Sequence, residues 1–241
     1  MKKLLTPLGI IVAIILVLWV VARVTGVLQF YSIPTIANEP AIKQGEHILT
    51  SNLIEPVPYK FITFLSRYED SLNAVYMPDA KNGVHYLHRL CGMPGDILEM
   101  KNGILFVNNK NFDDELNLKN QFKIKAADFI LIEETDIPVN DEYSQFTQTE
   151  DSAIVTFDKT GLKKYQSKIK FIPYIISDTS EAGGCFKWLN KNAAWTADNF
   201  GPLKIPADNY FVLGDNRHNA MDSRYTGFIN KNDIKGVVLN K

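Results

Sequence analysis

GDNRHNAMDSRYTGFI, residues 214–229, is the stretch with the densest run of charged and turn-forming residues in this chain of 241 residues. A strand-like apolar run, 210–213, leads into it, and its glycine and asparagines tolerate the turn geometries that such a connection needs. Asp215, Arg217, Asp222 and Arg224 bring opposite charges close together between apolar strands. This crowding predicts a fixed network of ion pairs and hydrogen bonds. The alternative is a charged surface hairpin.

The composition limits the partners and the chemistry. The formal net charge is −1 and the pI is about 6.4, so no basic surface for nucleic acid is expected. The two cysteines, Cys91 and Cys185, lie in dissimilar sequence settings, which favours two buried free thiols over a disulfide. The four histidines are scattered without a CxxC or His/Cys cluster, so we expect no metal site and no cofactor.

Two further segments carry turn signals. Residues 31–42 read YSIPTIANEPAI, and their prolines disfavour a helix, so we expect an extended segment that runs into a strand at 47–51. Residues 85–96 read HYLHRLCGMPGD, which fits a tight turn between two strands. Just beyond, Asn102-Gly103 lies between the apolar runs 96–100 and 104–107 and predicts a β-hairpin.

In their order along the chain, these three segments resemble the signature boxes of type I signal peptidases, the membrane-bound serine endopeptidases that cut signal peptides from exported proteins. Family members carry Ile-Pro-Ser-Gly-Ser-Met-x-Pro-Thr-Leu, then Lys-Arg-x-x-Gly-x-Pro-Gly-Asp, and finally Gly-Asp-Asn-Arg, Asn-Ser and Asp-Ser-Arg-Tyr-x-Gly. The resemblance implies a mainly β fold, an antiparallel β-sheet catalytic core with an inserted cap region after one N-terminal transmembrane helix. It divides the chain into an anchor and connector (1–30), a core (31–108 and 195–241) and a variable cap region (109–194).

Three positions that carry the family's chemistry depart from the boxes, and we call them the substituted positions. The resemblance places the family's nucleophilic serine at Ala37, its general-base lysine at His88, and a serine that helps to orient the base at Ala220. An alanine methyl cannot attack a carbonyl. Histidine is a competent base near neutral pH, and the eukaryotic and archaeal branch of these enzymes pairs a serine with a histidine. Beside Ala37, however, His88 has nothing to deprotonate, and the alternative interpretation is a side chain that fills the vacated lysine pocket.

Other positions keep the family's residue types. Thr35 falls where the family has a hydroxyl that helps to hold the oxyanion. Five residues of the last box match positions that support the scaffold, and we call them the brace: Asp215, Arg217, Asp222, Ser223 and Arg224.

The N-terminus predicts a membrane anchor. Residues 4–22 are apolar except for Thr6, and a helix of this length covers about 28 Å, close to the ~30 Å of a hydrocarbon core. A cleaved signal peptide ending near residue 22 is the alternative. Lys2 and Lys3 favour a cytoplasmic N-terminus. We therefore expect a single-pass protein of the plasma (inner) membrane, in contact with the lipid bilayer, whose main domain is extracytoplasmic.

The resemblance fades over 109–194. Short apolar runs at 129–132, 153–157 and 169–176 alternate with charged segments, and 161–165 suits a short helix. The region fits the family's cap, and a plain surface insertion is equally compatible.

Three functions remain open at this point. The first is a signal-peptidase-like protein that no longer cleaves, and instead binds the signal peptides of exported preproteins or assists an active paralogue. The second is a working endopeptidase with a non-standard nucleophile, Thr35 with His88 as base. The third is a purely structural membrane-anchored β domain. Loss of the nucleophile of a serine hydrolase costs on the order of 10⁶ in turnover, which favours the first.

Overall fold

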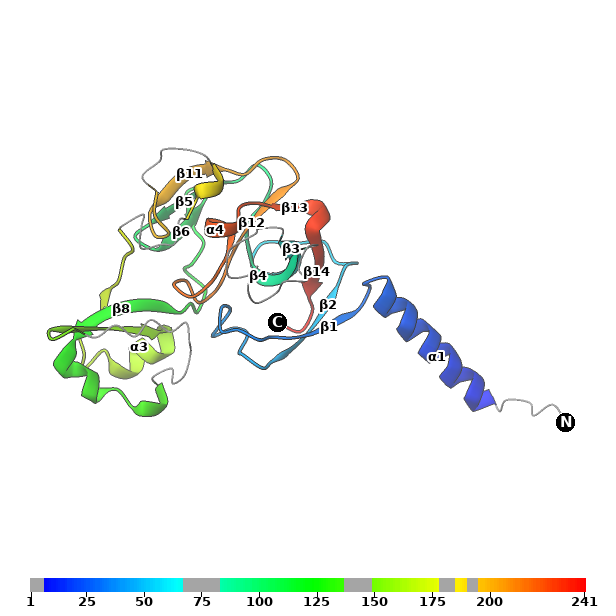
Figure 1. The fold of residues 1–241 in the computed structure, drawn as a ribbon, viewed down its shortest axis with the longest axis horizontal. Helices are drawn as coiled ribbons and strands as arrows, with labels where there is room; N and C mark the ends of the chain where they lie inside the picture. Colours follow the sequence, from blue (N-terminus) through cyan, green and yellow to red (C-terminus); the bar gives the residue numbers. More distant parts are fainter. Residues whose placement is uncertain (1–6, 67–82, 137–148, 178–184, 190–194) are drawn as a thin grey trace.

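The computed structural model describes residues 7–66, 83–136, 149–177, 185–189 and 195–241, which form three β-sheets with a few short helices (Figure 1). The strands within each sheet pair antiparallel. The mainly β, antiparallel architecture expected from the sequence is therefore confirmed.

The largest sheet has seven strands in the order β1-β2-β14-β3-β4-β12-β13. The strand predicted at 47–51 is β2, and the run predicted at 210–213 falls within β12. The bounds are β1 Gln29–Ser32, β2 His47–Ser51, β3 Phe61–Ser66, β4 Val84–Gly92, β12 Asn209–Leu213, β13 Ile229–Asn230 and β14 Ile234–Val238.

A second sheet has the order β11-β5-β6-β7, with β5 Ile97–Lys101, β6 Ile104–Val107, β7 Lys110–Asn111 and β11 Phe200–Lys204. The hairpin predicted around Asn102-Gly103 is confirmed, because β5 and β6 pair directly across these two residues. Both adopt positive φ angles, 49° and 78°, the conformation that the tightest hairpin turns require and that asparagine and glycine tolerate best.

The third sheet, β10-β8-β9, belongs to the region inserted between the second and last boxes. We call residues 120–173 the inserted lobe. It contains β8 Asn120–Lys125, β9 Ser152–Phe157, β10 Ile172–Pro173, α3 Lys159–Tyr165 and the 3-10 turns Ala126–Leu131 and Glu134–Asp136. The apolar run 153–157 forms a strand and 161–165 lies in a helix, as predicted, whereas 129–132 lies mostly in a 3-10 turn and only two residues of 169–176 are in a strand.

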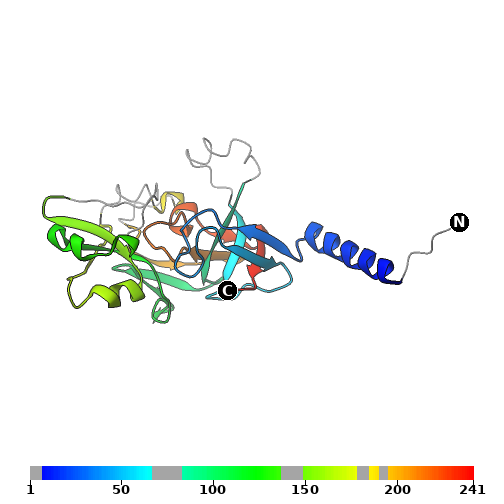
Figure 2. The same ribbon diagram turned by 90° about the horizontal axis from the view of Figure 1, so that it is seen from below.

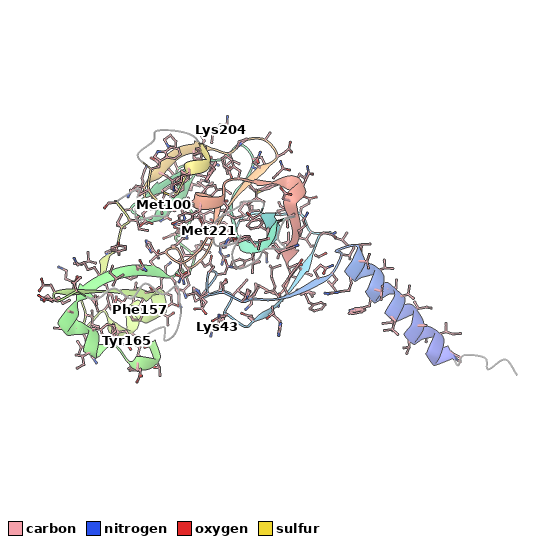
Figure 3. The ribbon with its side chains drawn as sticks, in the orientation of Figure 1. Lys43, Met100, Phe157, Tyr165, Lys204 and Met221 are labelled. Atoms are coloured by element: carbon pink, nitrogen blue, oxygen red, sulfur yellow. The ribbon has the colours of Figure 1, made fainter. Side chains whose placement is uncertain are left out.

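The inserted lobe has a hydrophobic core of its own, built around Ile124, Val155, Phe157 and Tyr165. Figure 3 shows Phe157 and Tyr165 together inside it, apart from Met100 in the second sheet. Its two ends meet where the Tyr174 N–H donates to the Gln121 carbonyl at 3.0 Å. The lobe thus has a core of its own, and its two ends lie next to each other.

Strand β12 lies between two cores of the main body. Phe211 and Leu213 pack into one cluster, and Tyr210 and Val212 pack into the other. Since neighbouring residues of a strand point to opposite faces, β12 is held on both sides. Its C-terminal end, where the last box begins at Gly214, is therefore fixed in position. The remaining short helices are α4 Ser223–Thr226 and the 3-10 turns Lys187–Leu189 and Lys231–Asp233.

The N-terminal helix, α1 Pro7–Val24, projects away from the β-sheets on the side opposite the inserted lobe, as Figures 1 and 2 both show. Residues 4–6 of the predicted membrane-spanning segment lie outside the described residues. Within the part of the chain that the structure describes, no helix is both long enough and apolar enough to cross a membrane.

Candidate functional site

The three substituted positions meet at Gly214. A methyl carbon added to this glycine would lie 2.3 Å from the Cβ of Ala220, 2.6 Å from the carbonyl oxygen of Ala37 and 3.4 Å from Nδ1 of His88. The three come from separate parts of the chain: the segment after β1, the middle of β4 and the loop after β12. The structure therefore brings together the residues that the sequence singled out.

The segment that carries Ala37 is not extended, so the prediction of an extended run was wrong. Residues 35–42 form bends and turns, because the Ile42 N–H donates to the Asn38 carbonyl at 2.9 Å and closes the chain on itself. The last box clamps this turn. The Asn216 N–H donates to the Ala37 carbonyl at 3.0 Å, and its side-chain amide donates to Ile36 O at 3.4 Å.

His88 is buried, with 2 % of its surface exposed. Its Nδ1 lies 3.2 Å from Oδ1 of Asn38, and its Nε2 lies 3.0 Å from the carbonyl oxygen of Met221. Figure 3 shows Met221 in the main body, away from the projecting N-terminal helix. Each ring nitrogen thus faces an oxygen acceptor, whereas a general base must direct a lone pair at the proton that it removes.

Burial lowers the pKa of His88, because an imidazolium is poorly solvated in the interior. The Asp222 carboxylate and the Met221 carbonyl act in the opposite direction, and the Arg224 guanidinium adds to the lowering. The residue at the family's base position is therefore a buried imidazole with an oxygen acceptor facing each ring nitrogen, and its neutral form can donate to only one of the two.

Thr35 lies at the surface, while His88 is buried. Both nitrogens of His88 are directed at Asn38 and Met221. Over the described ranges, no hydrogen bond joins Thr35 to His88. A Thr35–His88 pair of nucleophile and base is therefore not assembled in this structure.

The brace forms the network of buried ion pairs that the sequence predicted, and the alternative of a charged surface hairpin is wrong. Arg224 donates from Nε and Nη2 to the two oxygens of Asp222 at 2.9 and 2.8 Å, with both side chains fully buried. Burial disfavours the charge of Arg224, but the Asp222 carboxylate outweighs it and raises the pKa of the guanidinium. Such two-point pairs fix orientation as well as charge.

The other charged members of the brace pair with residues outside the last box. Arg217 donates to both oxygens of Asp113 at 2.7 and 2.6 Å. Arg89 of β4 donates to both oxygens of Asp215 at 2.7 and 2.5 Å. Asp215 thereby ties the last box to the residue next to His88.

Asp222 and Ser223 fold the loop back onto β12. Oδ2 of Asp222 accepts from the Gly214 N–H at 3.2 Å, and its Oδ1 caps α4 through the Arg224 N–H at the same distance. Oγ of Ser223 accepts from the Val212 N–H at 3.0 Å. These bonds bring Ala220 back against Gly214.

A buried His218–Asp198 contact beside the loop was not predicted from the sequence. Nδ1 of His218 accepts from the Gln121 N–H at 3.1 Å, so its other nitrogen, Nε2, donates to Asp198 at 2.9 Å. Burial opposes the charge of Asp198, yet the hydrogen bonds from His218 and from the Ile176 N–H keep its pKa below the usual value. The hydrogen bond from Gln121 to His218 joins the inserted lobe to the loop.

Lys119 is a second attachment that the sequence did not reveal. Its N–H donates to Asp215 O and its carbonyl accepts from the Arg217 N–H, both at 2.9 Å. Its ammonium group contacts Glu39, two residues from Ala37, at 2.6 Å. Lys119 directly precedes the inserted lobe, so it links the start of the lobe to the first box as well as to the last.

Cys91 and Cys185 are both free and buried, as predicted. Burial raises the pKa of Cys91 to about 12 and also raises that of Cys185. Neither thiol is a reactive group at neutral pH.

Comparison with known proteins places these observations in a family. The family model described as "Signal peptidase, peptidase S26" matches residues 5–240. The chain is 28% identical over 222 residues to signal peptidase I P of Bacillus subtilis subsp. natto, covering 91% of this chain and 84% of that protein. It is 26% identical over 230 residues to signal peptidase I of Buchnera aphidicola subsp. Baizongia pistaciae, covering 89% and 69%. A crystal structure of a signal peptidase I from Enterococcus faecalis V583 aligns with 77% of this chain and 98% of its own, at 22% identity and a TM-score of 0.34.

Proposed function

Because this chain belongs to the signal peptidase family, peptidase S26, we propose that it binds the signal peptides of exported preproteins without cleaving them. One observation carries the proposal. At the point where the substituted positions meet, Ala37 offers a methyl group, and both nitrogens of His88 are directed at oxygen atoms of Asn38 and Met221.

Cleavage in the family begins with attack by a serine hydroxyl, which a base activates. Alanine has no atom that can form the acyl bond, and removal of a serine nucleophile lowers turnover on the order of 10⁶. Ala220 also lacks the hydroxyl that would orient a base. The ordinary route is thus blocked at the nucleophile, the base and the residue that supports the base.

Binding of a peptide does not require the nucleophile or the base, and other groups of the site are retained. The brace keeps its ion pairs, so the loop and β4 hold their places around Gly214. The backbone N–H of residue 37 does not depend on the side chain, and Thr35 keeps its exposed hydroxyl. These groups can donate hydrogen bonds to a peptide carbonyl in the manner of an oxyanion site without any chemistry following.

Residues 109–194 act as a cap in this proposal, set into a core formed by 31–108 and 195–241. Two contacts support this role: Lys119 bonds to both boxes, and Gln121 bonds to His218. A signal peptide held at this site remains intact. It can then be passed to an active paralogue, which supplies the cleavage.

We also propose that the N-terminal segment attaches the protein to the plasma (inner) membrane as a single-pass anchor, with residues 1–30 as anchor and connector. The support is that residues 4–22 are almost wholly apolar, and that large side chains of α1 such as Leu16, Leu18 and Trp19 are more than half exposed. Exposed apolar surface of this extent is typical of a segment that lies in lipid. Alkaline extraction of membranes tests the attachment. Labelling of single cysteines placed on either side of the segment tests the orientation.

The central experiment uses the full chain in detergent with a preprotein and with its isolated signal peptide. We expect measurable binding of the signal peptide and no cleavage of the preprotein. We also expect cleavage to appear in the double variant Ala37→Ser, His88→Lys, which restores the family's nucleophile and base.

The same experiment separates the competing functions. Cleavage by the unmodified chain that disappears in Thr35→Ala would establish an endopeptidase with a non-standard nucleophile. Absence of binding by a folded chain, verified by circular dichroism, would leave a structural β domain. Either result overturns the proposal.

A further inference from the structure

Asn38 also departs from the first signature box, in which the family has methionine at this position. Its side chain is buried, with 2 % exposed. The amide nitrogen donates to the Leu87 carbonyl at 2.7 Å, and Oδ1 lies 3.2 Å from Nδ1 of His88. Both contacts go to neighbouring residues of β4. The Asn38 side chain, next to Ala37, therefore contacts β4 at the residue in the base position and at the residue before it.

The orientation of the Asn38 amide follows from the Leu87 contact. If the amide were turned over, its oxygen would lie against the Leu87 carbonyl oxygen, and two acceptors would face each other without a proton between them. The oxygen of Asn38 therefore faces His88. On the other side of the ring, the Met221 carbonyl is also an acceptor. Nδ1 is the ring nitrogen nearer to the site. A methyl carbon added to Gly214 would lie 3.4 Å from Nδ1 and 2.6 Å from the carbonyl oxygen of Ala37.

We propose that Asn38 is a positioning residue: its amide oxygen accepts the hydrogen of Nδ1 of His88, so the ring nitrogen nearer to residue 37 carries a proton and offers it no lone pair, while Nε2 faces the Met221 carbonyl. This inference rests on the proposed function and deepens it, because it identifies what disables the base independently of the missing nucleophile. His88 and Asn38 are then a matched pair: methionine at position 38 provides no amide oxygen to hold an imidazole.

The other groups around His88 act on it from a distance. Asp222 and Asp215 favour the protonated ring, and Arg224 disfavours it. From β3 and β4, Phe64 and Tyr86 place their rings 6.0 and 6.1 Å from the imidazole. Over the described residues, the direct polar contacts of the ring are those with Asn38 and Met221. Substitution of Asn38 therefore changes one identifiable hydrogen bond.

The first test follows the proton on His88 directly. The full chain, labelled with ¹⁵N-histidine in detergent, is titrated by NMR as the unmodified protein, as Asn38→Met and as Asn38→Asp, with His88→Gln to assign the signal. We expect the pKa of His88 to fall in Asn38→Met, because an acceptor is lost. We expect it to rise in Asn38→Asp, because a carboxylate is gained. We also expect the neutral ring of Asn38→Met to carry its proton on Nε2, facing Met221.

Identical titrations in the three proteins overturn the proposal. Should Asn38→Met fail to fold, the comparison of Asn38→Asp with the unmodified chain decides, because aspartate keeps the shape of asparagine.

The second test asks whether the nitrogen is withheld from residue 37. A thiol introduced by Ala37→Cys is alkylated with iodoacetamide, alone and combined with Asn38→Met, and mass spectrometry locates the label. Because a neighbouring base increases the thiolate fraction, we expect about tenfold faster alkylation in the double variant. Equal rates overturn the proposal. Neither test measures peptide binding or cleavage, so failure here is distinguishable from failure of the proposed function.

Discussion

The brace and the substituted positions lie around the same loop, but their side chains differ in what they contact. The charged brace residues are buried in two-point ion pairs. Ala37 and Ala220 contribute methyl groups, and His88 contributes an imidazole that contacts a neighbouring amide and a carbonyl. One set retains all the groups that hold the loop in place, and the other has lost the groups that would react.

This difference shows that scaffold and chemistry are separable in this fold. A methyl group in place of a hydroxymethyl group leaves no unpaired buried charge, so loss of the hydroxyl is tolerated by the folded state. Removal of one partner from a buried ion pair has the opposite effect, because the remaining charge stays buried without compensation.

Truncation of a brace side chain should lower the free energy of unfolding the most. Arg224→Ala leaves Asp222 buried without its guanidinium partner, and we expect it to lower the free energy of unfolding by about 3–5 kcal/mol. Urea denaturation followed by circular dichroism measures the loss. Lys101→Ala removes half of an exposed pair with Glu99 and serves as control, with an expected loss of about 1 kcal/mol or less. Equal losses in the two variants would contradict the distinction drawn above.

Addition of a methyl group at Gly214 should have the next largest effect. In Gly214→Ala the new carbon meets Ala220 at 2.3 Å and the Ala37 carbonyl at 2.6 Å, and we expect a loss of about 1–3 kcal/mol from overpacking. Combination with Ala220→Gly relieves the shorter contact and should recover part of the stability in the same urea measurement. No loss in the single variant would show that the substituted positions do not meet there.

The pH dependence of stability should report on His88. Since burial lowers its pKa, the unfolded chain takes up the proton first as the pH falls below about 6.5. Stability is therefore retained above that pH and lost below it, with a slope of at most about 1.4 kcal/mol per pH unit for one proton. Urea midpoints between pH 8 and pH 5 measure the slope. His88→Gln should reduce it, whereas His85→Gln, on the exposed part of the same strand, should not.

The smallest effect is expected at the attachment of the inserted lobe. The Lys119–Glu39 pair is about one-fifth exposed on each side, at 21 % and 19 %. Lys119→Ala should therefore cost about 1 kcal/mol or less, because the backbone bonds of Lys119 remain. A loss as large as that of Arg224→Ala would place Lys119 among the brace residues. The urea series used for Arg224 provides the comparison.

Local signals predicted the parts of the fold that local geometry decides. Asn102-Gly103 predicted the β5–β6 hairpin because the turn needs positive φ angles. The crowded charges of the last box predicted a buried network. The segment at 35–42 was mispredicted as extended, because a hydrogen bond from Ile42 to Asn38 closes a turn that proline content alone does not reveal.

Partners distant in the sequence could not be predicted. Arg89 and Asp215 are 126 residues apart, and Asp113 and Arg217 are 104 apart. The pairing of such charges depends on which strands lie side by side. Asn38 was missed for a different reason. An asparagine in a turn-rich segment looks like an ordinary turn residue until its amide is seen against His88.

The hydrogen bond that joins Gln121 to Tyr174 has a consequence for how this family can vary. The chain leaves the main body and returns to it at neighbouring points, so the segment between them forms a closed excursion, that is, a loop whose two ends lie side by side. The entropy of closing such an excursion grows only with the logarithm of its length. Descendants of this chain can therefore lengthen, exchange or shed the excursion while the strands on either side keep their places.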